Sequence, residues 1–285
     1  MQQQKALDNE QNTLGETTEM AFAGDFLKHR PSRLFVVLGG FFIANALVAE
    51  FIGVKIFALE NTLGVKPWDF NLFGQQGALQ FSAGVLLWPV VFIMTDIINE
   101  YYGKRGIRML SYLAMGLISY AFLMIFGAIQ LAPADWWVTQ NTARGVPDMQ
   151  AAFQVVLGQG MLIIAGSVLA FLVAQLIDVL VFHAIKSVTG ERMIWLRATG
   201  STLVSQLVDS FVVLLVAFKF GPAWTGAFEP WPWSQVLAVA VVQYTYKAMV
   251  ALGLTPALYL VHYAIDRYLG EPLAQQIKHQ ATKWN

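Results

Sequence analysis

The sequence predicts an all-α polytopic membrane protein with six transmembrane helices and both termini in the cytoplasm. Composition is the first observation behind this prediction, since 56% of the residues are hydrophobic and 13% are charged. Ordinary globular chains carry about 25% charged residues. The second observation is a series of six apolar segments, each meeting the roughly 20 residues that a spanning helix requires. The third is the charge of the connections between them, which alternates along the chain.

The six apolar segments predict spanning helices in chain order, near residues 34 to 59, 78 to 99, 107 to 131, 158 to 186, 200 to 221 and 234 to 264. Pro89 and Pro256 lie in the second and sixth segments, where we expect kinks that free backbone groups to face a cavity. Between segments, Gly64 to Gly77 predicts an irregular outer loop. Ala151 to Leu157 predicts a short interfacial helix.

Charge and tryptophan placement predict the orientation. Basic clusters mark alternate ends of the segments, at Lys28/Arg30/Arg33, Lys104/Arg105/Arg108, Lys186/Arg192/Arg197 and Arg267/Lys278/Lys283. The positive-inside rule places these ends, and therefore both termini, in the cytoplasm. Most tryptophans lie at the opposite ends of the segments, as expected for an outer interfacial belt, namely Trp68, Trp88, Trp136, Trp137, Trp224, Trp231 and Trp233.

One transmembrane domain is predicted, over residues 31–270. Residues 1–30 are rich in Gln, Asn, Thr and Glu and predict a disordered cytoplasmic tail, and residues 271–285 predict a second cytoplasmic tail. The basic cluster at Lys28 to Arg33 comes too late for the n-region of a signal peptide.

Several functional classes are disfavoured by what the sequence lacks. The absence of cysteine excludes disulfides, iron–sulfur clusters and thiol chemistry, and four scattered histidines argue against a zinc or haem site. No Walker-type phosphate loop occurs, which argues against ATP hydrolysis by this chain. We therefore expect no cofactor, no metal, no enzymatic activity and no nucleic-acid partner.

Ionisable residues inside the apolar segments are the strongest functional signal. They are Glu50 and Lys55 in the first segment, Asp96 in the second, Asp178 in the fourth, Asp209 in the fifth and Lys247 in the sixth. An acid at the bilayer centre costs about 2.5–3.5 kcal/mol on insertion scales, so each needs a partner or a function. If each Lys pairs with one acid, two carboxylates remain. We expect the surplus to be protonated, to bind a cation or to meet a ligand, with at least one of the four acids protonated.

Two copies of one motif, Gln175-Leu-Ile-Asp178 and Gln206-Leu-Val-Asp209, place an amide and a carboxylate on the same helix face. With nearby aromatic and amide side chains they have the composition of a pocket for a flat, hydrogen-bonding molecule. The candidate binding residues are Asp96, Asn99, Phe171, Gln175, Asp178, Gln206, Asp209 and Lys247. A purine-like ligand, a cationic amine and a vitamin ring all fit this set. The alternative is structural, with Asp178 or Asp209 paired to Lys247 to hold helices together.

Four further residues are predicted to act in gating or coupling: Glu50, Lys55, Glu100 and Arg197. Glu100 is expected to be a gate or a partner of Arg105 or Arg197. Trp195 and Arg197 are the residue types that anchor a helix at the inner interface.

The segment from Pro89 to Lys104, PVVFIMTDIINEYYGK, resembles the signature of the queuosine precursor transporter family. Further similar motifs are Gly166 to Phe182, Trp195-Leu-Arg197, Ser205-Gln-Leu-Val-Asp209, Tyr246-Lys247 and Pro256-Ala-Leu-Tyr259. The resemblance implies a six-helix carrier in the bacterial inner membrane, surrounded by lipid, that takes up 7-deazaguanine precursors of queuosine such as preQ0 or preQ1.

Two other functions stay open at this point. Membrane subunits that capture vitamins for a separate ATP-driven importer have a similar size and helix count. An intramembrane aspartyl enzyme would use Asp178 and Asp209 as a dyad, but Val208 stands where such proteases commonly have Gly. Both a monomer and a homodimer remain compatible with the sequence.

Overall fold

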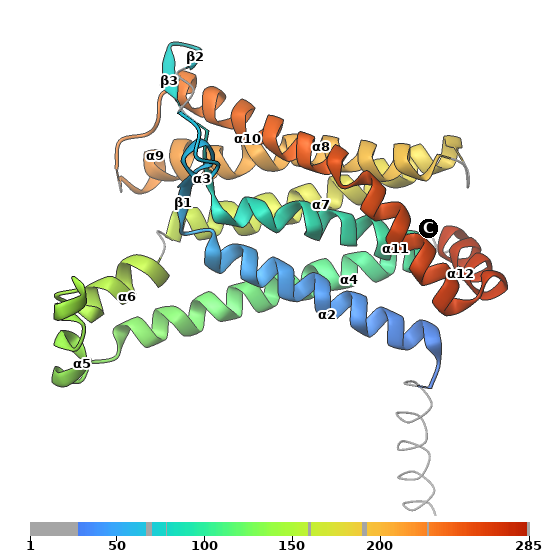
Figure 1. Ribbon diagram of the computed structural model, residues 1–285, viewed down its shortest axis with the longest axis horizontal. Helices are drawn as coiled ribbons and strands as arrows, with labels where there is room; N and C mark the ends of the chain where they lie inside the picture. Colours follow the sequence, from blue (N-terminus) through green and yellow to red (C-terminus); the bar gives the residue numbers. More distant parts are fainter. Residues whose placement is uncertain are drawn as a thin grey trace, which may run out of the picture.

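The computed structural model describes residues 28–66, 70–77, 79–158, 161–189, 193–226 and 228–283. Most of the predicted N-terminal tail, Trp68, Arg192 and Trp284 therefore lie outside the described residues. Five long helices run side by side and form the body of the protein (Figure 1). They are α2 (Arg30–Ile52), α4 (Trp88–Gln130), α7 (Met161–Thr189), α8 (Ile194–Leu214) and α10 (Trp233–Gly253).

Five helices in the described part of the chain are long and apolar enough to cross a membrane. The multi-pass, mainly helical prediction is confirmed at this level. The second and third predicted segments both lie in α4, which contains a non-helical residue, Gly103, with φ 66° and ψ −174°. The two arms of α4 run in opposite directions from that turn, the first drawn in teal and the second in green (Figure 1).

The first predicted segment is too long, because α2 ends at Ile52. The chain then enters strand β1 (Ile56–Ala58), which pairs antiparallel with β4 (Gln80–Ser82). Lys55 is therefore exposed beyond the helix and is not a buried residue of the first span. Pairing between strands separated by more than 20 residues is not visible in a local hydrophobicity pattern.

The outer loop predicted as irregular contains a β-hairpin, β2 (Phe70–Leu72) with β3 (Gln75–Gly77). The two residues of its turn, Phe73 and Gly74, both have positive φ, as a two-residue type I′ hairpin turn requires. A short helix, α3 (Leu59–Thr62), and a 3₁₀ turn, η1 (Ala83–Leu86), complete the same region.

The two prolines act at helix starts. Pro89 lies in the first turn of α4, where proline is favoured, so the predicted kink at this position is wrong. Pro256 occupies the same position in α11 (Thr255–Leu269), and the break at Leu254 divides the sixth predicted segment into α10 and α11.

The remaining helices lie at the two ends of the bundle (Figure 1). On the side of the strands are α5 (Asp135–Thr139), the 3₁₀ turn η2 (Thr142–Arg144) and α6 (Met149–Leu157), which confirms the short helix predicted at 151 to 157. On that side α8 also continues as a π-helix, η3 (Leu215–Phe220), and α9 (Gly221–Thr225). At the opposite end lie α11 and α12 (Glu271–Lys283), so the predicted C-terminal tail contains a helix.

Helix α12 docks against the turn of α4. Tyr101 donates a hydrogen bond to Asp266 at 2.7 Å, and Lys278 of α12 pairs with the same carboxylate at 2.8 Å. The Lys278 ammonium also lies over the Tyr101 ring, 4.9 Å from its centroid. A Cβ added at Gly103 would lie 2.8 Å from the carbonyl oxygen of Ala281. Glycine is thus required at this turn by its backbone conformation and by the close approach of α12.

The substitution Gly103→Ala tests this packing. The φ/ψ combination belongs to a region that is essentially restricted to glycine and costs about 1–3 kcal/mol for other residues, and the contact with Ala281 adds to it. We expect a lower midpoint of thermal unfolding for the purified protein in detergent. Gly116→Ala, in the same helix with nothing within 4 Å of an added Cβ, is the matched control and should not lower the midpoint. Equal midpoints for the two variants would contradict this account.

Candidate functional site

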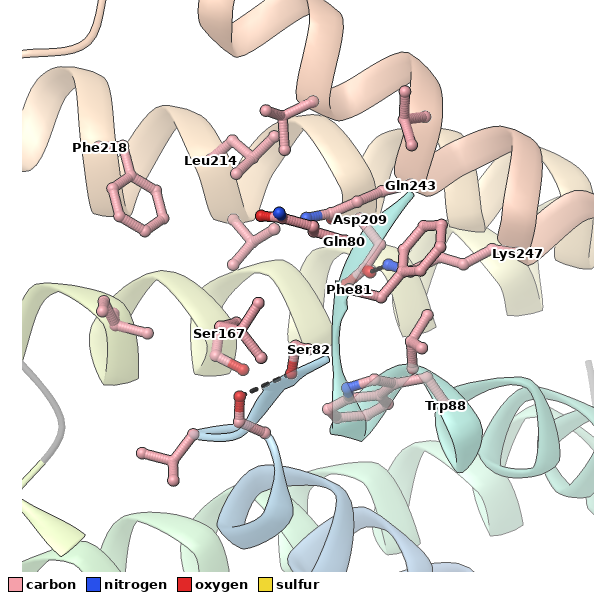
Figure 2. A pocket seen from close by; sticks show the side chains of 18 of the residues that line it. Gln80, Phe81, Ser82, Trp88, Ser167, Asp209, Leu214, Phe218, Gln243 and Lys247 are labelled. Carbon is pink, nitrogen blue, oxygen red and sulfur yellow. Dashed lines mark hydrogen bonds and ion pairs between the residues drawn. The ribbon is translucent and has the colours of Figure 1, made fainter. Parts of the chain in front are cut away.

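A cavity of about 880 Å³ lies between α2, the start of α4, α7, α8 and α10, with the paired strands beside it. Its volume is within the range of roughly 300–1,000 Å³ that is typical of small-molecule sites. Polar and charged side chains from several elements face it, among them Glu50 of α2, Gln80 of β4, Asp209 of α8, and Gln243 and Lys247 of α10. Figure 2 shows Gln80, Gln243 and Asp209 grouped on one side of this cavity.

An ion pair forms the charged centre of the cavity wall. The Lys247 ammonium of α10 lies 2.5 Å from the Asp209 carboxylate of α8, and the two side chains are 7% and 14% exposed. The sequence predicted either Asp178 or Asp209 as a structural partner of Lys247, and in the structure the partner is Asp209. Glu50 of α2 is buried on the same wall, where its carboxylate accepts a hydrogen bond from Ser167 of α7.

Aromatic rings form the apolar part of the wall. Trp88 at the start of α4 packs on Phe171 with ring centroids 5.5 Å apart, and Phe81 of β4 packs on Tyr246 at 4.6 Å. Trp88 and Phe81 face the cavity, whereas Phe171 lies behind Trp88 and is not part of the lining. The Ser82 hydroxyl donates to the carbonyl oxygen of Gly53 at 2.7 Å, which fixes β4 to the end of α2 (Figure 2).

Next to the cavity along α4, α7 and α8, polar side chains form a buried polar layer. It consists of Thr95, Asp96, Gln175, Asp178, Ser201, Thr202, Ser205 and Gln206. Asp96 is hydrogen-bonded to Ser201 at 3.2 Å and accepts from Thr202 at 3.0 Å. Asp178 and Ser205 are hydrogen-bonded at 3.0 Å. Every member of the layer is at most 2% exposed, and none lines the cavity.

A cluster of three charged residues lies further along the same helices. Glu100 of α4 accepts from Arg197 of α8 at 2.7 Å and pairs with Lys186 of α7 at 3.2 Å, and all three side chains are at most 4% exposed. Arg197 is thus the partner of Glu100, as one of the two predicted alternatives had it, and its side chain is buried in this ion pair. Asn99 lies beside this cluster, 2.7 Å from the His183 ring. Trp195 is half exposed, as an interfacial residue would be.

Chain order along the helices separates these three groups by depth. On α4, Trp88 at the cavity precedes Asp96 in the layer and Glu100 in the ion-pair cluster. On α7 the order is Ser167, Asp178, Lys186, and antiparallel α8 has the reverse order, Arg197, Ser205, Asp209. The buried polar layer therefore lies between the cavity and the ion-pair cluster.

Only two of the eight predicted binding residues, Asp209 and Lys247, line the cavity. Four are in the buried polar layer (Asp96, Gln175, Asp178 and Gln206), Asn99 lies beside the ion-pair cluster, and Phe171 backs the cavity wall. Of the predicted gating residues, Glu50 lines the cavity, Glu100 and Arg197 form the ion-pair cluster, and Lys55 is exposed outside all three groups.

The sequence analysis did not identify Lys186 and Gln80 as candidate site residues. Lys186 continues the polar stripe of α7 that runs through Gln175, Asp178 and Phe182 at spacings of three and four, so helical periodicity could have found it. Gln80 was hidden because residues 78 to 99 were interpreted as one helix, whereas Gln80 belongs to strand β4.

Comparisons with known proteins agree with the membrane architecture. Residues 82–261 match the family described as "Putative vitamin uptake transporter". A "Probable queuosine precursor transporter" of Bacillus subtilis (strain 168) is 32% identical over 149 residues, which are 52% of this chain and 59% of that protein. No solved structure matches the chain.

Two further relatives carry similar names. A "Probable queuosine precursor transporter" of Haemophilus influenzae is 23% identical over 77% of this chain and 87% of that protein. The "Queuosine precursor transporter" of Escherichia coli (strain K12) is 25% identical over 59% of this chain and 66% of that protein. These names describe transporters and not enzymes.

The ion-pair cluster should contribute strongly to stability. Glu100→Gln leaves two buried cations without their anion, and breaking a buried pair in this way costs about 3–5 kcal/mol. Asp266→Asn, the matched control, removes a carboxylate whose pair with Lys278 is more exposed, and should cost about 1 kcal/mol or less. Unfolding of both purified variants by denaturant measures the difference. A cost for Glu100→Gln no greater than that for Asp266→Asn would show that the cluster is not an essential structural contact.

Proposed function

Since the chain belongs to the vitamin uptake transporter family, we propose that it is a carrier that imports 7-deazaguanine precursors of queuosine, such as preQ0 and preQ1, across the bacterial inner membrane. The names of the three relatives support the substrate class. The single observation that carries the proposal is the cavity wall, on which a carboxylate, an ammonium group, two amides and aromatic rings face one space.

The cavity chemistry suits a guanine-like base. A carboxylate accepts hydrogen bonds from two adjacent N–H groups, which is what the ring N–H and the exocyclic amine of such a base present. Asp209 supplies this carboxylate, and its ion pair with Lys247 holds it in a fixed position. The amides of Gln80 and Gln243 are placed to read the carbonyl group, and Trp88 offers a face for stacking.

The proposed topology has six crossings with both termini in the cytoplasm. The turn at Gly103 supports this count, because each arm of α4 then crosses once. Basic residues Lys104, Arg105 and Arg108 follow the turn, which supports a cytoplasmic position for it. With this orientation the cavity lies at the outer end of the bundle, and the ion-pair cluster of Glu100, Arg197 and Lys186 closes the inner end.

Transport then requires the inner end to open while the cavity closes. The substrate would pass from the cavity through the buried polar layer when the Glu100 ion pairs separate and the helices rock. Asp96, Gln175, Asp178 and Gln206 would contact it during this passage, and Asn99 at its inner end. Glu50 is proposed to act in coupling at the outer end, since it lines the cavity.

Removing the charged centre of the cavity tests the binding site. Asp209→Asn and Lys247→Gln should each reduce uptake of radiolabelled preQ1 about 10–100-fold in cells lacking the endogenous carrier. A lost hydrogen bond to a charged group costs about 1.5–3 kcal/mol, and 1.4 kcal/mol is a factor of ten. Asp135→Asn and Lys66→Gln, at exposed positions outside the cavity, are the matched controls and should transport normally. Normal uptake by Asp209→Asn at normal expression would contradict the site.

Reconstitution distinguishes the proposed carrier from the alternative function, a capture subunit for an ATP-driven importer. The purified chain alone, in liposomes, should take up preQ1 without any ATPase. Binding without uptake, restored by a copurifying ATPase, would support the alternative function.

Cysteine labelling tests the orientation on a natural cysteine-free background. In spheroplasts, a membrane-impermeant maleimide should label Gln80→Cys at the cavity, and preQ1 should protect that cysteine. Ser187→Cys, exposed at the end of α7, should react only after the membrane is opened. The reverse pattern of labelling would place the cavity at the cytoplasmic end.

A further inference from the structure

The buried polar layer contains two carboxyl groups whose hydrogen bonds are incomplete if both are ionised. Asp96 and Asp178 are 2% and 0% exposed, and no Lys, Arg or His in the described part of the chain forms an ion pair with either. The Oδ2 atom of Asp178 has no hydrogen-bond donor among the described residues. An isolated ionised carboxylate buried in this way carries a large desolvation cost and normally becomes neutral.

The hydroxyl of Ser201 indicates which form Asp96 takes. Its oxygen lies 3.2 Å from Asp96 Oδ1 and 3.0 Å from the carbonyl oxygen of Ala198. If Asp96 is ionised, both neighbours are acceptors, and a hydroxyl has one proton to donate. If Asp96 is protonated, its O–H donates to Ser201, Ser201 donates to Ala198, and Thr202 donates to the other carboxyl oxygen at 3.0 Å. The protonated form therefore supplies a separate proton for each of these three contacts.

The same arrangement recurs at Asp178. The hydroxyl oxygen of Ser205 lies 3.0 Å from Asp178 Oδ1 and 3.0 Å from the carbonyl oxygen of Thr202. Again two acceptors would compete for one proton if Asp178 were ionised, and a protonated Asp178 resolves the competition. Asp96 and Asp178 thus have the same arrangement. In each, a serine hydroxyl lies between the carboxyl group and a backbone carbonyl oxygen of α8.

The charged groups on the surrounding helices are engaged elsewhere. Arg197 of α8 and Lys186 of α7 pair with Glu100, and Lys247 of α10 pairs with Asp209. His183 of α7 contacts Asn99, and Glu50 of α2 accepts from Ser167. This surrounding favours neutral carboxyl groups in the layer.

We propose that Asp96 and Asp178 form a proton-binding site, and that the protons they carry across the membrane drive uptake. The site lies between the outer cavity and the inner ion-pair cluster, where a coupling site must lie to be reached from each side in turn. When the inner end opens, each carboxyl group gives its proton to water on that side, and it regains one from the outer side through the cavity. The coupling role rests on the proposed transport function, whereas the protonation does not.

Infrared spectroscopy of the purified full-length protein in nanodiscs tests the protonation directly. At neutral pH the wild type should show the carbonyl stretch of protonated carboxyl groups, and Asp96→Asn and Asp178→Asn should each remove part of it. An Asn amide can donate to the serine as the protonated acid does, so both variants should fold. Asp209→Asn, the matched control, removes a carboxylate that forms an ion pair with Lys247 and should leave the band unchanged. If neither Asp96→Asn nor Asp178→Asn reduces the band, the proposal that these carboxyl groups are protonated is wrong.

Proteoliposomes test the coupling. With an inward proton gradient the wild type should accumulate preQ1, whereas Asp96→Asn and Asp178→Asn should accumulate at least about tenfold less, and the uptake that they retain should be the same with and without the gradient. Wild-type accumulation by both variants, or accumulation that follows a sodium gradient alone, would overturn proton coupling. If the wild type neither binds nor exchanges preQ1, the proposed function fails, and the infrared result still decides the protonation.

Discussion

The constraint on which the structure depends is the cost of placing charge between helices in a medium of low polarity. Each ionised side chain in the bundle needs a counter-ion at hydrogen-bonding distance. At longer distances the attraction between the two charges is too weak to offset the free energy of removing them from water. Glu100 meets this requirement with Arg197 and Lys186, and Asp209 meets it with Lys247. These contacts fix the relative positions of α4, α7, α8 and α10, so the electrostatic pairing also sets the register of the helices.

The same constraint divides the bundle by depth. Ion pairs occur in the Glu100 cluster and beside the cavity, and the layer between them is polar without ion pairs among the described residues. A hydrogen-bonding molecule can cross a polar layer of this kind without separating opposite charges, whereas it cannot cross the ion-pair cluster in this way. In the proposed transport cycle, separating the ion pairs of this cluster is therefore the energetically demanding step.

The sequence predicted the features that depend on local periodicity. Segment positions, the polar stripes and the shared face of Gln175 and Asp178 all follow from the 3.6-residue repeat of a helix. It could not predict features that depend on a distant partner. Lys55 was placed in a helix because apolar residues flank it, whereas the pairing of β1 with β4 ends that helix early. The turn at Gly103 lies in the gap that the sequence left between the second and third apolar segments, whereas the close approach of α12 to it depends on a distant partner.

The two Gln-x-x-Asp motifs show this limit most directly, because identical local patterns meet different neighbours. Helices α7 and α8 are antiparallel, and Ser205 bonds to Asp178, which places these two residues at one depth. Asp209 follows Ser205 by four residues, so at 1.5 Å per residue it lies about 6 Å nearer the end of the bundle that holds the cavity. This offset of one helical turn puts Asp178 opposite a hydroxyl in the buried layer and Asp209 opposite Lys247 at the cavity. The register between two helices, which no pattern within either helix specifies, therefore gives one acid a hydroxyl partner and the other an ammonium partner.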